Sequence, residues 1–495
     1  MVSLDNINCR MVGKSLTLFM SNLKSRRLIN ISCFRRFLRA MPCSLFFAVC
    51  LSLGLSGCNG NPDVIRDIRE LSQDHFAYVD KRQCDFPLVS PAWQKKMDEQ
   101  YRANYFMPWH QEASRFSKSD VEQAWVTFKY DAREGKKGKR RRRAWIGKMA
   151  ANAELLSYPN SSMKAITTVT AHLRHLPAAR ALYSKPGSSG EKSSPFDKLQ
   201  VSSIAPGTPI YISHISRDRA WAIVETGYAL GWMPLKDLAF VSPEFGKRWE
   251  QGPHAAVIRE KTPIYDQNEG LLFRASLGSM FPKTAEDEDT LTIIAPARVK
   301  QGWAESRKAV LLKETAMTRP VAMTPCRLAA LANEMIREPY GWGGLRNNRD
   351  CSAMIRDLLA PFGLWLPRHS ADQANEGGLY VDLSNLSPAE KKKLILARGV
   401  PYLTLLWLKG HIMLYIGSRN GEPLIFHNFW GVRTMSERGK QGKKTVGHAA
   451  ITTLYPGREF NGMGQPEGVY SRYLQGMILI VPADQMSLTV TAGGG

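Results

Sequence analysis

Residues 340–362 read YGWGGLRNNRDCSAMIRDLLAPF, and this stretch places a cysteine at the start of a predicted helix. After Cys351 the apolar residues recur at steps of three and four, which is the period of a helix with one buried face. These residues are Met354, Ile355, Leu358 and Leu359. Asp350 is a favourable N-cap directly before the helix. A thiol in the first turn of a helix lies at the positive end of the helix dipole, which favours the nucleophilic thiolate.

The alternative for Cys351 is a small buried hydrophobe, which is the usual environment of a lone cysteine. Two downstream segments favour chemistry instead. Residues 410–417, GHIMLYIG, predict a buried strand that opens with His411, and residues 423–431, PLIFHNFWG, predict a second strand that carries His427. A cysteine on a helix that faces a histidine on a strand, with a further polar group orienting the imidazole, is the papain-type arrangement.

Three separate segments carry a resemblance to a known family. RDCSAMIRDLLAPFGLWLPRHSADQ, GHIMLYIG and HNFWGV together resemble the NlpC/p60 family of papain-like cysteine peptidases, which cut bacterial peptidoglycan stem peptides. The order Cys, His, His along the chain is the order of the family. The resemblance implies an α+β fold whose papain-like cysteine peptidase domain spans residues 324–485.

The expected roles of the three residues follow from their chemistry. Cys351 would attack the peptide carbonyl, His411 would keep it ionised and later protonate the leaving amine, and His427 would hold His411 in one tautomer. Backbone N–H groups at the start of the helix are expected to stabilise the oxyanion. This chemistry needs neither a metal nor a cofactor. His369 and His448 remain alternatives if a strand is misplaced.

The resemblance also implies a substrate, a stem peptide with a free N-terminal L-Ala, then D-Glu joined through its γ-carboxyl to a diamino acid. Asp350 would bind the free ammonium, with helix capping as the alternative role. Arg368 would bind the α-carboxylate of D-Glu, because its planar fork binds carboxylates bidentately. The residues that fall where the family lines its acyl-side pocket are Trp342, Ser352, Arg368 and Ser370. The basic loop over residues 346–349 departs from many relatives, which bears on the depth of this pocket.

The N-terminus contains a predicted targeting signal. Arg35, Arg36 and Arg39 precede an apolar run over residues 45–55, and the sequence Leu-Ser-Gly-Cys follows and ends at Cys58. This order resembles a bacterial lipoprotein signal, and the apolar run is too short for a permanent membrane span. We expect a signal peptide over residues 1–57, lipidation of Cys58, a polar tether over residues 58–83, and a location on the periplasmic side of a bacterial membrane.

Charge and cysteine usage are consistent with this targeting signal. The 495 residues carry a formal net charge of +23, and the chain stays strongly basic without its leader. At an extracytoplasmic site the available polyanions are wall carboxylates, phosphates and lipid head groups, so no nucleic acid partner is expected. Beyond Cys58 only Cys84, Cys326 and Cys351 remain, too few and too scattered for a zinc site or a disulfide-rich scaffold. Whether Cys84 pairs with Cys326 stays open.

The middle of the chain predicts three smaller units. Residues 84–160 predict a helical N-terminal segment. Within it, residues 136–143 read KKGKRRRR, and we expect this basic run to form a solvated surface loop. The alternative is that the run binds a polyanion. Residues 161–243 and 253–318 contain short alternating segments with turn signals, and they resemble two bacterial SH3-like barrels joined by a linker over residues 242–252.

One barrel aromatic leaves two interpretations open. Trp221 either fills the core of the first barrel or, as in family members with this architecture, lines the peptidase cleft together with Glu225.

The sequence therefore predicts a lipid-anchored cysteine endopeptidase that cleaves the γ-D-glutamyl bond to a diamino acid in stem peptides or released muropeptides, in wall turnover or recycling. Two alternatives stay open. An amidase or acyltransferase would use the same three residues on another amide. A wall-binding lipoprotein would have barrels that bind glycan or peptide and an inert peptidase domain.

Overall fold

The computed structural model of the chain describes residues 64–129, 136–183, 196–435, 441–460 and 469–487. The predicted signal peptide, Cys58 and the first residues of the predicted tether lie outside this part of the chain. The residues from Val64 onward belong to one compact unit. Among the described residues, no helix is both long enough and apolar enough to cross a membrane.

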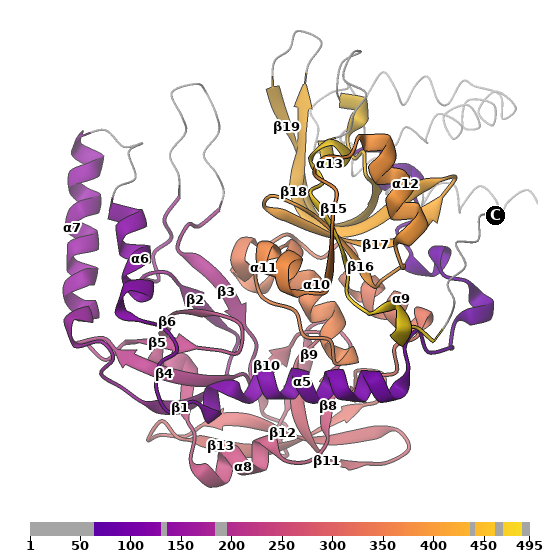
Figure 1. The fold of residues 1–495 in the computed structure, drawn as a ribbon. Coiled ribbons are helices and arrows are strands. Elements are labelled where there is room, and N and C mark those ends of the chain that lie inside the picture. The colour runs from indigo at the N-terminus through magenta and orange to yellow at the C-terminus, as the bar shows by residue number, and fades with distance from the viewer. Residues whose placement is uncertain (1–63, 130–135, 184–195, 436–440, 461–468, 488–495) are drawn as a thin grey trace, which may run out of the picture. The chain divides into compact units, whose positions relative to one another are not determined.

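A six-stranded antiparallel sheet forms the centre of the C-terminal domain (Figure 1). Its strands, in spatial order, are β15 (Leu379–Asp382), β20 (Gly476–Leu479), β16 (Thr404–Leu408), β17 (His411–Arg419), β18 (Glu422–Met435) and β19 (Gln441–Thr453). The helices of this domain are α9 (Pro325–Met335), α10 (Cys351–Leu359), α11 (Ser370–Glu376), α12 (Pro388–Arg398) and α13 (Val469–Tyr473). The mixed helix and sheet architecture confirms the predicted α+β fold class.

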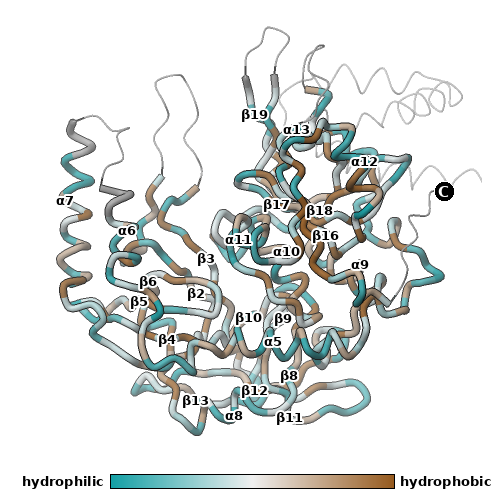
Figure 2. Tube along the Cα trace, viewed as in Figure 1, coloured by the Kyte–Doolittle hydropathy of each residue, from teal (hydrophilic) through white to brown (hydrophobic). Residues whose placement is uncertain are grey.

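Helix α10 forms where the apolar period predicts it. Asp350 caps its N-terminus, because Oδ1 accepts the backbone N–H of Ala353 at 3.0 Å. The residues of the predicted buried face are all at most 1 % exposed: Met354, Ile355, Leu358 and Leu359. They share one hydrophobic core with the apolar residues of β17 and β18, which are brown in Figure 2. Burial of this face holds the start of the helix beside the sheet.

The first barrel is a seven-stranded antiparallel sheet. In spatial order its strands are β3 (Gln200–Ile204), β2 (Ala171–Arg174), β6 (Leu230–Pro234), β5 (Trp221–Glu225), β4 (Pro209–Ile215), β1 (Met163–Thr167) and β7 (Leu238–Phe240). One face of β4 and β5 packs into the barrel core through Ile210, Ile212, Ala222 and Val224. The residues between them are also buried, against elements outside the barrel core, so both faces of these two strands are covered.

The second barrel contains a five-stranded sheet and a two-stranded sheet. The larger sheet orders β13 (Ala304–Leu312), β12 (Thr290–Arg298), β11 (Met280–Glu286), β8 (His254–Val257) and β14 (Ala316–Thr318), and the smaller one pairs β10 (Leu271–Ala275) with β9 (Thr262–Tyr265).

The connection between the barrels, predicted as a linker, is a helix instead. Ser242 caps the N-terminus of helix α8 (Pro243–Glu250), and its hydroxyl accepts the N–H of Phe245. Trp249 of this helix is buried against Phe281, which is why the connection is packed rather than extended.

Residues 64–83, the described part of the predicted tether, pack against the peptidase domain. Helix α4 (Arg66–Glu70) places Asp67 so that it accepts hydrogen bonds from the backbone and the hydroxyl of Thr453. His75 is fully buried, and its Nδ1 lies 2.9 Å from the hydroxyl of Tyr402. The tether prediction is therefore wrong for these residues, because the polar composition of the segment hid a small number of buried contacts.

Helix α5 (Pro91–His110) links the three folded parts of the described chain. Near its start, the amide of Gln94 donates to the carbonyls of Val321 and Phe362. Near its end, the indole N–H of Trp109 donates to the carbonyl of Ala165 in the first barrel at 2.8 Å. These bonds, together with the packing of Phe106 into the core of the second barrel, hold the three folded parts together.

The N-terminal segment is also joined covalently to the peptidase domain. Cys84 and Cys326 form a disulfide with their Cα atoms 4.9 Å apart. This answers the question that the sequence left open.

The basic run over residues 136–143 belongs to a helix rather than a loop. Helix α7 (Lys136–Ala153) lies beside α6 (Lys118–Lys129), and its buried residues Ile146 and Met149 face a cluster that includes Trp125 and Trp232. The apolar residues after the basic run have helical spacing, so the helix extends back through the cations. Arg140, Arg141 and Arg143 are exposed on it.

Candidate active site

The nucleophile candidate Cys351 is the first residue of α10 and is 7 % exposed. Its sulfur accepts the backbone N–H of Ile412, which places it at the beginning of β17, next to His411. Burial raises the pKa of the Cys351 thiol to about 12, and the nearby charge of Asp350 raises it further, against the lowering effect of the two backbone N–H donors. The expectation that the helix start alone favours the thiolate is therefore wrong, and ionisation requires a base.

The two candidate histidines contact each other. His411 Nε2 lies 2.9 Å from His427 Nδ1, and His427 Nε2 lies 3.0 Å from the hydroxyl of Thr452. The Thr452 hydroxyl donates its own proton to the carbonyl of Thr453 at 2.9 Å, so it accepts from His427. His427 Nδ1 is then an acceptor, and His411 donates to it from Nε2. This leaves Nδ1 of His411 as the unprotonated nitrogen.

The imidazoles lie in an apolar and aromatic environment. His427 is fully buried, and its ring stacks on Phe429 with centroids 4.0 Å apart. The ring of Tyr470 contacts both histidines, with centroid distances of 5.5 Å. Burial lowers the pKa of His411 to about 4, although Asp350 has a raising effect, and burial together with His411 lowers the pKa of His427. Both histidines are therefore neutral at neutral pH.

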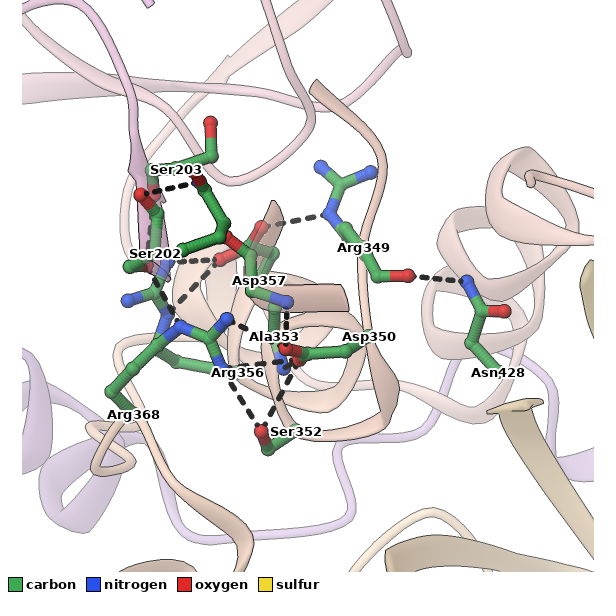
Figure 3. A network of polar contacts seen from close by, with 12 residues as sticks. Ser202, Ser203, Arg349, Asp350, Ser352, Ala353, Arg356, Asp357, Arg368 and Asn428 are labelled. Atoms are coloured by element: carbon green, nitrogen blue, oxygen red, sulfur yellow. Dashed lines mark hydrogen bonds and ion pairs between the residues drawn. The ribbon is translucent and has the colours of Figure 1, made fainter. Parts of the chain in front are cut away.

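Asp350 is the centre of the polar network in Figure 3. Its carboxylate receives two hydrogen bonds from Arg368, at 3.1 and 2.7 Å, and others from the backbone of Gly343 and Ala353. Burial opposes ionisation, but Arg368 and these N–H donors outweigh it and lower the pKa of Asp350. Arg368 also donates to the hydroxyl of Ser202 in the first barrel at 2.8 Å. Asp350 and Arg368 satisfy each other in this arrangement, and their substrate-binding roles stay predictions.

The other predicted substrate-binding residues fall in different places. Ser352 is buried and donates to Asp350. Trp342 is 42 % exposed and stacks on Phe196 of the first barrel, with centroids 5.2 Å apart. Ser370 is the first residue of α11.

Trp221 and Glu225 do not line the site. Trp221 packs beside Trp232 in the cluster under α6 and α7. It lies on the face of β5 opposite to the barrel core that holds Ala222 and Val224, so it neither fills that core nor lines the site. Glu225 is buried and accepts hydrogen bonds from Gln111, Ser114 and Arg115. Both residues are occupied by packing and hydrogen bonding within the N-terminal half of the described chain.

The two alternative histidines lie apart from the His411–His427 pair. His369 is the N-cap of α11 and lines a cavity of about 560 Å³ together with His175 of the first barrel. His448 lies on β19, opposite Phe429. Neither position offers the hydrogen-bonded chain that begins at His411. Among the described residues, no group of three or more His, Cys, Asp or Glu side chains is arranged to hold a metal ion.

The last residue of the basic loop before the nucleophile, Arg349, turns inward, whereas Arg346 is exposed. Arg349 is 7 % exposed and forms ion pairs with Asp357 of α10 and with Glu260 of the second barrel. Its carbonyl accepts a hydrogen bond from Asn428 of β18 at 3.0 Å. Arg349 therefore connects the second barrel with the nucleophile helix and the histidine strand. Its contacts with Asp357 and Asn428 are drawn in Figure 3.

Four family models match the chain in the order of these structural parts. Residues 43–158 match the N-terminal stabilising domain of NlpC/P60 proteins, residues 182–234 an SH3 domain of SH3b1 type, and residues 242–288 an SH3 domain of SH3b2 type. Residues 337–448, which include Cys351, His411 and His427, match the NlpC/P60 family itself.

The chain carries an NlpC/P60 domain. A solved NlpC/P60 endopeptidase from Photobacterium damselae subsp. piscicida is 26 % identical, with a TM-score of 0.71 over 85 % of this chain and 99 % of that one. An NlpC/P60 family protein from Bacillus cereus is 18 % identical, with a TM-score of 0.43 over 64 % of this chain and 100 % of that one. No curated protein is significantly similar in sequence.

The match to the NlpC/P60 family has two consequences. The family is one of cysteine peptidases, and it supports a role for the chain as a peptidoglycan hydrolase. The SH3b domains point in the same direction, toward binding of peptidoglycan.

Sequence reasoning missed several residues of this NlpC/P60 site. Thr452 ends the hydrogen-bonded chain from His411, and Tyr470 packs on both imidazoles. Gln373 donates to the carbonyl of Ser352 and supports the first turn of α10. Nothing in the local sequence marks these residues, because each reaches the site from an element distant along the chain.

Proposed function

We propose that this protein is a peptidoglycan stem-peptide endopeptidase that cleaves the γ-D-glutamyl bond to a diamino acid by a Cys-His-His mechanism. The observation that carries the proposal is the chain from His411 through His427 to Thr452, beside a cysteine whose sulfur accepts the N–H of Ile412. A neutral base oriented by a second imidazole is what a buried thiol with a raised pKa requires.

The proposed reaction begins with proton transfer. Nδ1 of His411 takes the proton of Cys351, and the thiolate attacks the γ-carbonyl carbon of D-Glu. Negative charge develops on the carbonyl oxygen, where backbone N–H groups at the start of α10 would stabilise it. The protonated His411 then gives its proton to the departing amine of the diamino acid, which leaves a thioester on Cys351.

Hydrolysis of the thioester completes the cycle. His411, neutral again, takes a proton from a water molecule that attacks the thioester carbon. Collapse of this second intermediate breaks the bond from carbon to sulfur and releases the γ-carboxylate of D-Glu, and the proton on His411 returns to Cys351. His427 stabilises the imidazolium of His411 in both halves of the reaction, because it is held as an acceptor by Thr452.

We further propose an extracytoplasmic, lipid-anchored location. The proposal rests on the lipoprotein-like order of residues 35–58 and is supported by the disulfide between Cys84 and Cys326, since disulfides persist mainly in oxidising compartments. Labelling of cells with a fatty acid analogue should mark the wild-type protein and leave the Cys58→Ser variant unmarked. Equal labelling of both would exclude Cys58 as the site.

Mass spectrometry of reaction products tests the catalytic proposal. The purified protein is incubated with L-Ala-γ-D-Glu-diamino acid tripeptide and with its N-acetylated form, beside the Cys351→Ala variant. Release of the L-Ala-D-Glu dipeptide by the wild type alone would support the endopeptidase. Cleavage of the free amine form only would add a requirement for the ammonium, whereas cleavage of both forms would remove that requirement.

Two results would favour the other functions. Release of L-Ala from the sugar of a muramyl peptide would indicate an amidase. No cleavage of any substrate, with Cys351 reacting with iodoacetamide no faster than a free thiol, would indicate a binding protein with an inert peptidase domain.

A further inference from the structure

Two cations face each other on the hairpin that continues from the histidine strand. Arg433 of β18 and Lys443 of β19 are direct cross-strand partners, and both are exposed. Like charges directly opposite each other in an antiparallel pair are destabilising. Neither side chain forms an ion pair with a carboxylate in the part of the chain that the structure describes. Among the described residues, these two positive charges are therefore not compensated by a carboxylate.

Lys443 contacts an aromatic ring of the first barrel. Its ammonium lies over the ring of Phe196, 5.8 Å from the centroid. Partial burial lowers the pKa of Lys443, and the charge of Arg433 lowers it further. The next residue, Lys444, lies over Phe460 instead, since adjacent side chains of a strand point to opposite faces. Of the two neighbouring lysines Lys443 and Lys444, Lys443 is therefore the one on the side of the first barrel.

An aromatic cluster connects this cation pair with the nucleophile. Phe196 lies 5.2 Å from Trp342, 5.6 Å from Trp430 and 5.8 Å from Tyr340, measured between ring centroids. Tyr340 forms a backbone bridge with Arg349, two residues before Cys351, which places it beside the start of α10. Aromatic side chains from both domains therefore form a continuous cluster between the start of α10 and Lys443, whose cross-strand partner is Arg433.

We propose that Arg433 and Lys443 form a carboxylate-binding subsite that receives a carboxylate of the substrate peptide at the outer end of the aromatic cluster. This inference rests on the proposed function, which supplies a substrate with several carboxylates. A guanidinium and an ammonium side by side can hold one carboxylate by charge-assisted hydrogen bonds. The aromatic rings would pack against the aliphatic part of the same substrate.

The carboxylate of the diamino acid fits this position better than the α-carboxylate of D-Glu. Lys443 contacts Phe196, and Phe196 in turn contacts Tyr340, so the cations are separated from Tyr340 by one aromatic ring. An extended chain advances about 3.5 Å per residue. The α-carboxylate of D-Glu is close to the scissile carbonyl in the same residue, whereas the end of the diamino acid extends away from it. The two carboxylates have the same chemistry, so substrates with one of them replaced by a carboxamide can distinguish them.

Steady-state kinetics on three tripeptides tests the subsite. The substrates are the free acid, the form with a carboxamide at the diamino acid, and the form with a carboxamide at the α-carbon of D-Glu. For the wild type we expect KM to rise roughly fivefold with the first carboxamide, with little change in kcat. Lys443→Gln and Arg433→Gln should each raise KM for the free acid roughly fivefold, to the value of the carboxamide, and should therefore no longer distinguish acid from amide.

A matched control variant is Lys444→Gln, which removes a neighbouring charge on the opposite face and should leave KM unchanged. Thermal unfolding of all variants checks that the hairpin stays folded. Discrimination by the wild type against the D-Glu carboxamide, lost in Lys443→Gln, would support the subsite and assign it to D-Glu. Equal KM values for all three substrates, or discrimination that persists in both variants, would overturn the subsite. No cleavage of any tripeptide by the wild type would instead overturn the proposed function, and the subsite with it.

Discussion

His411 and His427 are joined by a hydrogen bond of 2.9 Å between Nε2 and Nδ1, and Thr452 sets its direction from the far side of His427. The hydroxyl of Thr452 donates to the carbonyl of Thr453, so only its lone pair is available to His427. A residue on β19 thereby selects the nitrogen of His411 that acts as the base. The following predictions depend on this relationship and on the contacts that support it.

Thr452→Val should slow catalysis without weakening substrate binding. Valine has nearly the shape of threonine but cannot accept the Nε2 proton of His427, so His411 would lose its fixed tautomer. We expect kcat to fall roughly tenfold with KM unchanged, as for an interaction made mainly in the transition state. Thr452→Ser, which keeps the hydroxyl, should restore most of the activity, and equal activity of the valine and serine variants would contradict the tautomer assignment.

The acid limb of the pH profile should lie well below the ordinary pKa of histidine. Burial lowers the pKa of His411 to about 4, and catalysis needs the neutral imidazole. As pH falls, activity should therefore be retained through pH 6.5 and should be lost as pH approaches 4. The measurement is kcat/KM against pH, restricted by circular dichroism to the range where the protein stays folded. An acid limb near pH 6.5 would show that His411 is more hydrated than the structure indicates.

Acid should destabilise the fold through two other buried histidines, His75 and His254. Burial lowers the pKa of both to about 3 from an unfolded value of 6.5, so between these values the unfolded chain binds more protons. Stability then falls with decreasing pH, by about 1.4 kcal/mol per pH unit for each histidine. His75→Gln should reduce the slope of unfolding free energy against pH between 6 and 4 by about this amount. An unchanged slope would mean that His75 takes up its proton without unfolding.

The disulfide should contribute strongly to stability. Cys84 and Cys326 are separated by 242 residues, and closing so large a loop removes about 5 kcal/mol of chain entropy from the unfolded state in the simplest model. The Cys84→Ser and Cys326→Ser double variant should unfold at lower denaturant concentration than the wild type under oxidising conditions. Reducing agent should lower the midpoint of the wild type toward that of the variant and leave the variant unchanged.

Loss of Arg349 should loosen the second barrel from the nucleophile helix. Its buried guanidinium bridges Glu260 and Asp357, and removal of one partner from a buried ion network costs about 3 to 5 kcal/mol. Arg349→Met should lower the midpoint of thermal unfolding and increase proteolysis between the barrel and the peptidase domain. Arg346→Met is the matched control, because Arg346 in the same loop is exposed. Similar midpoints for the two variants would show that the network is not important for domain association.

The sequence by itself determined the elements whose signal is local. The apolar period after Cys351 predicted the buried face of α10, Asp350 predicted its cap, and the apolar runs around His411 and His427 predicted β17 and β18. The residue types and their order also indicated the peptidase family. These features depend on side chains within a few positions of each other, where helix and strand geometry fixes which face each residue occupies.

Only the tertiary structure decided how these elements serve one another. The raised pKa of the Cys351 thiol results from burial, whose effect exceeds the lowering effect of the N–H group at the helix start. The carboxylate of Asp350, which the sequence predicted as the partner of the substrate ammonium, is hydrogen-bonded to Arg368. The start of α10 is held by the ion pair between Arg349 and Glu260, which are 89 residues apart, and the tautomer of His411 is set by the contact between His427 and Thr452, which are 25 residues apart. Contacts at such separations leave no periodic pattern in the sequence, and the tether prediction was wrong for this reason, because Asp67 bonds to Thr453. The basic run over residues 136–143 is different, since the helical spacing of the apolar residues that follow it was a local signal.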